Sequence, residues 1–233
     1  TVSGASDNLT LVPVANIVFG GADANRTVTV TPVANGVGSA TITLTVSDGT
    51  LTADEEFVLT VGAVDDVPTI SEIANQSIDE DGDTGALSFV VDDAETPVAS
   101  LTVSGASDNL TLVPVANIVI GGADANRTVT VTPVLNGHGS ALITLTVSDG
   151  NLTASESFLL DVRAVDDAPG IVVNTGVVVD QGSSVTLEDG MLLASDVDTP
   201  PAQLVYTLTA ESGSGQLLRS DAQLAIGGTF TQL

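Results

Sequence analysis

Apolar and polar residues alternate along much of this chain. In TITLTVSDG, residues 41–49, the side chains of Ile42, Leu44 and Val46 fall on one face and threonines fall on the other. This spacing predicts a half-buried β-strand. RTVTVTPV, residues 26–33, has the same period. Because no segment shows sustained helical periodicity, the pattern predicts an all-β protein.

Turn residues separate these alternating segments. Asn-Gly or Asp-Gly pairs, which are typical of tight turns between strands, stand at 35–36, 48–49, 81–82, 136–137 and 149–150. For residues 67–167 we expect strands near 68–73, 76–79, 86–91, 98–104, 109–114, 127–133, 140–148 and 155–163. Seven or eight strands in a domain of about 100 residues are typical of an immunoglobulin-like Greek-key sandwich.

Two segments of the chain are copies of one another. Residues 1–66 and 102–167 differ at ten of 66 aligned positions and are offset by 101 residues. Solenoid units are shorter, about 20–50 residues, so this period predicts β-sandwiches in a linear array. We expect the end of a repeat at 1–66, a complete repeat at 67–167 and the beginning of another at 168–233. The sequence is therefore expected to be a segment of a longer protein.

Composition narrows the possible partners. The net charge is −26, with four Arg, no Lys, no Cys and one His. Such a charge argues against binding to nucleic acid or to anionic membrane surfaces. The 43% apolar content argues against a disordered acidic tail, and no apolar run approaches the roughly 18 residues of a membrane span, so we expect no membrane insertion in this segment. The missing cysteines suit an exported bacterial protein or an intracellular one.

Acidic residues collect where strands end and modules meet. They lie in the segments 63–69, 77–84, 90–96, 147–150, 163–169 and 194–200. Adjacent carboxylates repel one another unless a cation lies among them. Calcium accepts six to eight oxygen ligands in flexible geometry, whereas zinc, copper and iron–sulfur centres require His or Cys clusters. The sequence therefore predicts Ca²⁺ as the bound ion.

Other features have simpler explanations. An isolated Asp-Gly pair serves turns for backbone reasons. SIDEDGDT, residues 77–84, resembles the start of an EF-hand loop but lacks flanking helices and a closing Glu. GGADAN, at 20–25 and 121–126, predicts a tight turn. His138 is replaced by Val37 in the other copy, and no Ser or acid pair has the partner that catalysis requires, so we expect no enzyme activity.

A family resemblance rests on the segment 46–70. VSDGTLTADEEFVLTVGAVDDVPTI resembles the end of one bacterial cadherin-like repeat and the start of the next, and 147–169 repeats it. Asp65 and Asp166 stand where that family more often has Asn. Residues 174–232 resemble the chondroitin-sulfate-proteoglycan type of cadherin-related repeat. The resemblance implies an extracellular, calcium-stiffened stalk, either on a bacterial cell surface or secreted.

The same resemblance implies the calcium ligands. At the first joint they are Asp65 and Asp66 with Asp92, Asp93, Glu95 and Asp149. At the second joint they are Asp166 and Asp167 with Asp196 and Asp198, joined by Glu80 or Asp81 from the base of the middle module. Cadherins proper have an acidic loop where this chain has TPVLNGHGS, residues 132–140. We therefore expect one or two ions per joint, with dissociation constants of about 0.1–1 mM.

Three functions follow as hypotheses. The leading one is a non-catalytic stalk of a bacterial surface protein in cell adhesion or biofilm formation. Its partners would be calcium and, through other domains, a host or neighbouring-cell surface. The second is an adhesive module that binds glycans or a like chain directly, although 3% aromatic residues offer few platforms for sugars. The third is a spacer within a secreted multidomain enzyme.

Overall fold

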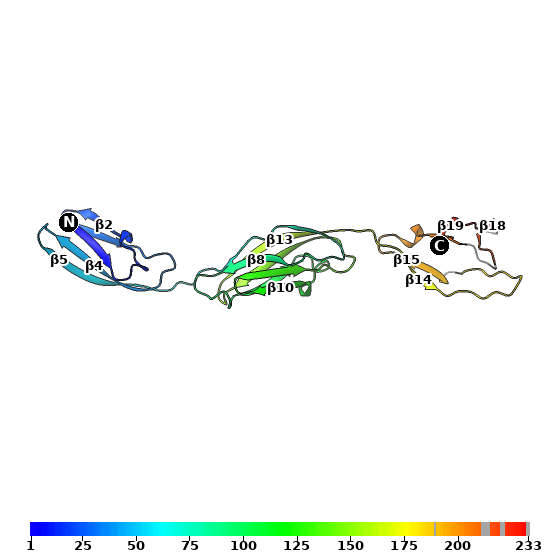
Figure 1. Ribbon diagram of the computed structural model, residues 1–233, viewed down its shortest axis with the longest axis horizontal. Coiled ribbons are helices and arrows are strands. Elements are labelled where there is room, and N and C mark those ends of the chain that lie inside the picture. Colours follow the sequence, from blue (N-terminus) through cyan, green and yellow to red (C-terminus); the bar gives the residue numbers. More distant parts are fainter. Residues whose placement is uncertain (189, 211–214, 220–221, 232–233) are drawn as a thin grey trace.

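The computed structural model describes residues 1–188, 190–210, 215–219 and 222–231. It shows three bodies in a line, joined by short linkers (Figure 1). We call them the first module (1–66), the middle module (67–167) and the third module (168–233). Strands dominate, and the only helical elements among the described residues are the three-residue 3₁₀ turns Val14–Asn16, Val115–Asn117 and Pro201–Gln203. The expected all-β array of immunoglobulin-like sandwiches is confirmed.

The middle module packs two four-stranded sheets face to face. One sheet has the order β10-β11-β8-β6 and the other β7-β13-β12-β9. The bounds are β6 (Thr69–Ile70), β7 (Gln76–Asp79), β8 (Leu87–Asp92), β9 (Thr102–Ser107), β10 (Ile118–Ala123), β11 (Asn126–Val131), β12 (Gly139–Ser148) and β13 (Thr153–Arg163). All pairings are antiparallel except β7 with β13, which is parallel. The chain crosses between the sheets after β6, β7, β8, β9 and β11.

The alternation of apolar and polar residues along β12 determines which of its side chains enter the core. Ile143, Leu145 and Val147 are fully buried between the sheets. Thr144 and Thr146, on the opposite face, share hydrogen bonds of 2.9 Å with serine hydroxyls of β13. The buried set forms one continuous cluster, as expected of a sandwich whose inner faces interdigitate.

The predicted strand at 109–114 is wrong, and β10 was missed. The Asn109 side chain accepts hydrogen bonds from the Leu112 amide at 3.2 Å and from the Thr111 hydroxyl at 2.7 Å. These bonds fold the segment into a turn, although its apolar side chains at 112 and 113 are buried. Two glycines in β10 removed the alternation that would have predicted a strand there. The strand expected at 98–104 lies instead at 102–107.

The first module consists of five strands. They are β1 (Val2–Ser6), β2 (Ile17–Ala22), β3 (Asn25–Val30), β4 (Gly38–Ser47) and β5 (Thr52–Val61). One sheet has the order β1-β4-β5, and the other is the pair β2-β3. These strands correspond to β9–β13 at an offset of 101 residues, and their buried cluster contains five residues.

The third module is built from short strand pairs. They are β14 (Gly170–Asn174) with β15 (Leu192–Ser195), β16 (Val205–Thr207) with β19 (Thr229–Thr231), and β17 (Leu218–Arg219) with β18 (Ala222–Gln223). Of its described apolar side chains, Ala194 and Leu204 alone are buried. The rings of Tyr206 and Phe230 stack at a centroid distance of 5.0 Å.

Candidate cation sites at the module joints

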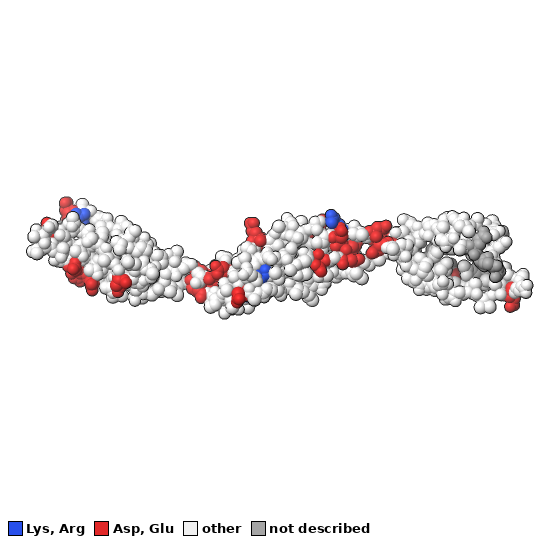
Figure 2. Space-filling model, viewed as in Figure 1, with Lys and Arg blue, Asp and Glu red and all other residues white. Residues whose placement is uncertain are grey.

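Acidic side chains gather at the two places where modules meet. Figure 2 shows red surface at the start of the middle module and a larger group where the middle module approaches the third. We call the linker 62–68 with its surroundings the first joint, and the linker 164–169 with its surroundings the second joint. Each joint contains acids from the linker and from the module that follows it.

Strand pairing brings the acids of the first joint together. Thr69 pairs with Asp92, which places the end of the linker beside the turn after β8. The Asp66 amide donates to Oε2 of Glu95 at 3.1 Å. Oδ1 of Asp93 accepts from the amides of Glu95 at 3.0 Å and Thr96 at 2.6 Å. One oxygen of Asp93 thus holds the turn after β8, and Glu95 holds the linker.

Asp149 reaches the same joint from the β12–β13 turn. Its Oδ1 accepts from the amides of Asn151 at 2.6 Å and Leu152 at 2.7 Å. Nδ2 of Asn151 donates to Oδ2 of Asp65 at 2.5 Å. The hairpin turn of the middle module therefore contacts the linker directly. Asn151 was not among the predicted site residues. Its one signal in the sequence is that the first module has Thr50 at the equivalent position.

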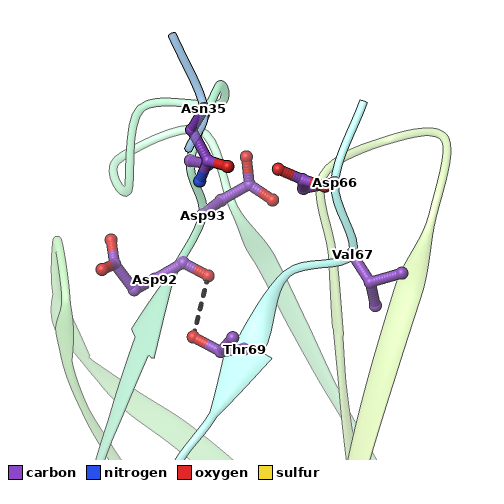
Figure 3. Close-up of a pocket in the computed structure, with 7 residues that line it drawn as sticks. Asn35, Asp66, Val67, Thr69, Asp92 and Asp93 are labelled. Atoms are coloured by element: carbon purple, nitrogen blue, oxygen red, sulfur yellow. Dashed lines mark hydrogen bonds between the residues drawn. The ribbon is translucent and has the colours of Figure 1, made fainter. Parts of the chain in front are cut away.

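Two carboxylate oxygens of the first joint are buried without a partner. These are Oδ2 of Asp93 and Oδ2 of Asp149. An open hollow at the joint is lined by Asn35, Asp66, Val67, Thr69, Asp92, Asp93 and Ala94. Figure 3 shows the carboxylates of Asp66 and Asp93 turned toward one space beside Asn35, whereas the Asp92 side chain points away from it. Asp92 contributes its main-chain oxygen, which accepts from the Thr69 hydroxyl at 3.2 Å.

The second joint repeats the geometry of the first. Gly170 pairs with Ser195 in the register of Thr69 with Asp92. The Asp167 amide donates to Oδ2 of Asp198 at 2.7 Å. Oδ1 of Asp196 accepts from the amides of Asp198 at 3.0 Å and Thr199 at 2.7 Å. Asp166 is exposed in the linker.

Acids at the base of the middle module approach this second joint. Glu80 is buried, and its Oε1 accepts from the Val165 amide at 2.7 Å. Oδ1 of Asp81 accepts from the Asn136 amide at 2.8 Å. Oδ2 of Asp167 is buried without a partner. Desolvation raises the pKa of Asp167 above its ordinary value, and the charges of Asp81, Asp198, Glu80 and Asp196 raise it further.

The acidic side chains at both joints offer oxygen ligands. Within the described ranges, no group of three or more His, Cys, Asp or Glu side chains is arranged to hold a metal ion. The unpartnered oxygens of Asp93, Asp149 and Asp167 are nevertheless the hard donors that calcium takes. The residues of both joints therefore fit this ion by donor chemistry, while their ligand roles remain a prediction.

Comparison with known proteins finds a family likeness for part of the chain. Residues 169–233 match the family model described as "Cadherin-like". The chain is 31% identical over 96 residues to Extracellular matrix protein 3 of Lytechinus variegatus, covering 41% of this chain and 3% of that protein. It is 26% identical over 164 residues to the extracellular matrix organizing protein FRAS1 of Mus musculus, covering 65% of this chain and 4% of that protein.

Solved structures give a more distant likeness. Titin domains Z1Z2, in complex with telethonin, align with a TM-score of 0.36 and 14% identity, covering 71% of this chain and 82% of that chain. None of the described helices is long and apolar enough to cross a membrane. The third module is thus similar to cadherin-like repeats, and the matched relatives, of which the chain spans a few per cent, are extracellular matrix proteins.

Proposed function

We propose that this chain is a non-catalytic spacer of an extracellular adhesion protein, exported to a bacterial surface or secreted, whose joints are stiffened by calcium. The observation that carries the proposal is the set of carboxylate oxygens buried without partners at both joints. A buried charged oxygen that lacks a partner destabilises the folded state. A bound cation would turn this penalty into attraction.

The ligands differ between the joints. At the first joint, Asp93 and Asp149 would bind through the oxygens that make no hydrogen bond, with Asp65, Asp66 and Glu95 beside them. At the second joint, Asp167, Asp196 and Asp198 would bind with Glu80 or Asp81. Bound calcium supplies positive charge that ties the linker carboxylates to the module that follows.

The chain itself sets the direction of each linker. Hydrogen bonds from the Asp66 and Asp167 amides fix each linker to the turn ahead of it. The Val165 amide fixes the second linker also to Glu80, in the module behind it. Charge repulsion among the acids and the conformational entropy of the linker oppose this arrangement. Removing the ion would therefore let the modules swing while the middle sandwich stays folded on its own core.

Small-angle scattering of the chain, in calcium, in magnesium and in chelator, tests the proposal. In calcium we expect scattering to give a longer maximum dimension than in magnesium or chelator. Thermal unfolding should give a higher melting temperature in calcium. Profiles identical in all three conditions would contradict it.

Two neighbouring aspartates provide a matched pair of variants. Asp93→Asn should remove the calcium response of the first joint, because its Oδ2 is one of the two unpartnered buried oxygens there. Asp92→Asn should leave the response intact, because that side chain points away from the hollow (Figure 3). If Asp92→Asn also removes the response, Asp92 is a ligand and the site differs from the one proposed.

A further inference from the structure

The chain contains six Asn-x-Ser/Thr sequons, the acceptor motif for N-linked oligosaccharides. Their asparagines are Asn8, Asn25, Asn75, Asn109, Asn126 and Asn151. A motif this short also arises by chance, so the sequence alone does not identify a modified residue. The structure distinguishes the six by what each asparagine side chain does in the folded chain.

Two of the six asparagines cap turns with their side chains. Nδ2 of Asn109 donates to the carbonyl of Ser140 at 3.0 Å, and its Oδ1 accepts from Thr111, the hydroxyl of its own sequon, at 2.7 Å. Asn8 makes the equivalent bonds in the first module, at 3.2 and 2.7 Å. In both sequons the amide and the hydroxyl are therefore occupied.

Two others bind distant parts of the chain. Oδ1 of Asn75 accepts from the Leu159 amide at 2.8 Å, which holds the side chain against β13. Nδ2 of Asn151 donates to Oδ2 of Asp65 at 2.5 Å, in the linker of the first joint. An oligosaccharide on Asn151 would replace a hydrogen of the nitrogen that makes this contact.

Asn126 lies beside a tight turn and keeps its side chain unbonded. β10 ends at Ala123 and β11 begins at Asn126, so Asp124 and Ala125 form the loop of the hairpin. Asn126 is exposed, and its side-chain amide makes no hydrogen bond within the part of the chain that the structure describes. The strand that neighbours β11 on its other side, β8, is present, so this exposure belongs to a complete sandwich.

The strand presents both functional groups of this sequon on one face. Residues two apart in a strand point the same way. The side chains of Asn126 and Thr128 therefore lie on the outer face of β11, while the fully buried Val129 points to the core. Gly121 lies opposite Thr128, and a Cβ there would come within 2.8 Å of the threonine hydroxyl. The glycine thus leaves that hydroxyl accessible.

The first module repeats this arrangement 101 residues earlier. Asn25 follows the loop of the β2–β3 hairpin, and Asn25 and Thr27 are both exposed. Gly20 lies opposite Thr27, where a Cβ would again come within 2.8 Å of the hydroxyl. Each copy of the repeat therefore carries one accessible sequon on the same strand.

We propose that Asn25 and Asn126 each accept an N-linked oligosaccharide and that the other four sequons of the folded chain do not. Nδ2 of the asparagine attacks the anomeric carbon of an oligosaccharide carried on a polyprenyl pyrophosphate. A C–N bond forms, the C–O bond to the pyrophosphate breaks, the amide loses one proton and the lipid pyrophosphate leaves. The modification rests on the export that the proposed function includes, but not on calcium. It would place one bulky, hydrophilic group on each repeat of the array.

Transfer to the folded chain tests this assignment. The probe is a bacterial oligosaccharyltransferase that acts after folding and selects an acid two residues before the asparagine, supplied with its lipid-linked donor. Asp23, Asp124 and Asp149 provide that acid for Asn25, Asn126 and Asn151, respectively. Peptide mass spectrometry should find the oligosaccharide on the first two asparagines and not on the third. An unmodified Asn126 would overturn the inference.

Asn151 is the internal control for the effect of the fold. Trypsin cleaves after Arg127 and Arg163 and leaves the Asn151 sequon whole. In such a digest the contact with Asp65 is lost, so the same enzyme should modify Asn151. Equal occupancy of Asn151 and Asn126 in the folded chain, or no transfer to Asn151 in the digest, would overturn the role of side-chain contacts in selecting the sites.

Two threonine variants test recognition of the sequon itself. Thr128→Ala should abolish transfer to Asn126 and leave Asn25 modified. Thr130→Ala is the matched control, because Thr130 lies on the same face of the same strand but outside the sequon, and both sites should stay modified. Transfer to Asn126 that survives Thr128→Ala would overturn the assignment. If the chain is modified while scattering shows no calcium effect on the joints, this inference stands and the proposed calcium function fails.

Discussion

The two copies of the 66-residue segment have nearly the same sequence and different interiors. Phe57 and Phe158 sit in the same strand context, yet the first is 39% exposed and the second is 1% exposed. The copy at 102–167 packs against strands from residues 67–101, whereas the copy at 1–66 has no such partner among the described residues. Alternation thus determines which face of a strand is apolar, and a separate segment determines whether that face is buried.

Arg127 shows the same dependence. In the middle module its guanidinium donates to the carbonyls of Val98 and Leu101 at 3.3 Å, and so holds the segment that leads into β9. The equivalent Arg26 bonds within its own hairpin, to the carbonyl of Gly21 at 3.2 Å. One residue type at one position therefore links two halves of a sandwich in one copy and has only a local role in the other.

Amide exchange should give the largest difference between the copies. The Val131 amide donates to the Thr84 hydroxyl at 3.0 Å, at the edge covered by residues 67–101. Among the residues that the structure describes, the Val30 amide has no equivalent of Thr84 beside it. We expect Val131 to exchange at least about a thousandfold more slowly, because its exchange requires opening of a complete core. Hydrogen-exchange mass spectrometry or NMR measures this, and equal rates would show that the first module is covered in solution.

Truncating Phe158 and Phe57 should destabilise their two modules by different amounts. Phe158→Ala should lower the free energy of unfolding of the middle module by about 3–5 kcal/mol, since it leaves a cavity in a closed core. Phe57→Ala should cost about 1–2 kcal/mol in the first module, because its ring is already partly hydrated. Calorimetry measures both losses of stability. Each unfolding transition is first assigned to a module with a variant that destabilises that module alone. Similar costs would mean that the two cores are equally closed.

Adding a methyl group at two equivalent glycines should have a smaller effect. A Cβ at Gly105 would lie 2.5 Å from Cγ2 of Ile118 and 3.5 Å from Cδ2 of the buried Leu145. Gly105→Ala should therefore destabilise the middle module by about 1–3 kcal/mol. At Gly4 the nearest atoms are Cγ2 of Ile17 at 2.7 Å and Cζ of Phe19 at 3.2 Å. The buried cluster around them contains five residues and is smaller than that of the middle module, so we expect it to adjust more easily and Gly4→Ala to cost under about 1 kcal/mol. Urea unfolding of both variants tests the order, and a larger loss for Gly4→Ala would contradict it.

The sequence predicted the long strands well because their period was undisturbed. β12 was expected at 140–148 and lies at Gly139–Ser148, and β13 was expected at 155–163 and lies at Thr153–Arg163. The segment at 109–114 failed because Asn109 forms a turn whose hydrogen bonds outweigh the strand preference of the apolar residues that follow. Side-chain capping of this kind depends on geometry that periodicity does not contain.

For the joints, the sequence could indicate the acids but not their orientations. Asp92 and Asp93 are adjacent and look alike in sequence, yet one points away from the hollow and the other keeps an unpartnered oxygen beside it. The last residue of a strand and the first of a turn face different directions, so only the register of β6 with β8 distinguishes them. The contact of Asn151 with Asp65 crosses 86 residues and has no local signal.

We expect the smallest effect at the position that is His138 in the middle module and Val37 in the first module. Nδ1 of His138 lies 3.8 Å from Oε2 of Glu80, and the histidine side chain is 59% exposed. Glu80 keeps its hydrogen bond from the Val165 amide when the imidazole is removed. His138→Val should therefore change the stability of the middle module by no more than about 0.5 kcal/mol, as expected for an exposed pair. Val37→His in the first module is the reciprocal control, with the same small limit. A loss above about 1 kcal/mol for His138→Val alone would show that this contact, and not only the covering strands, distinguishes the middle module from its copy.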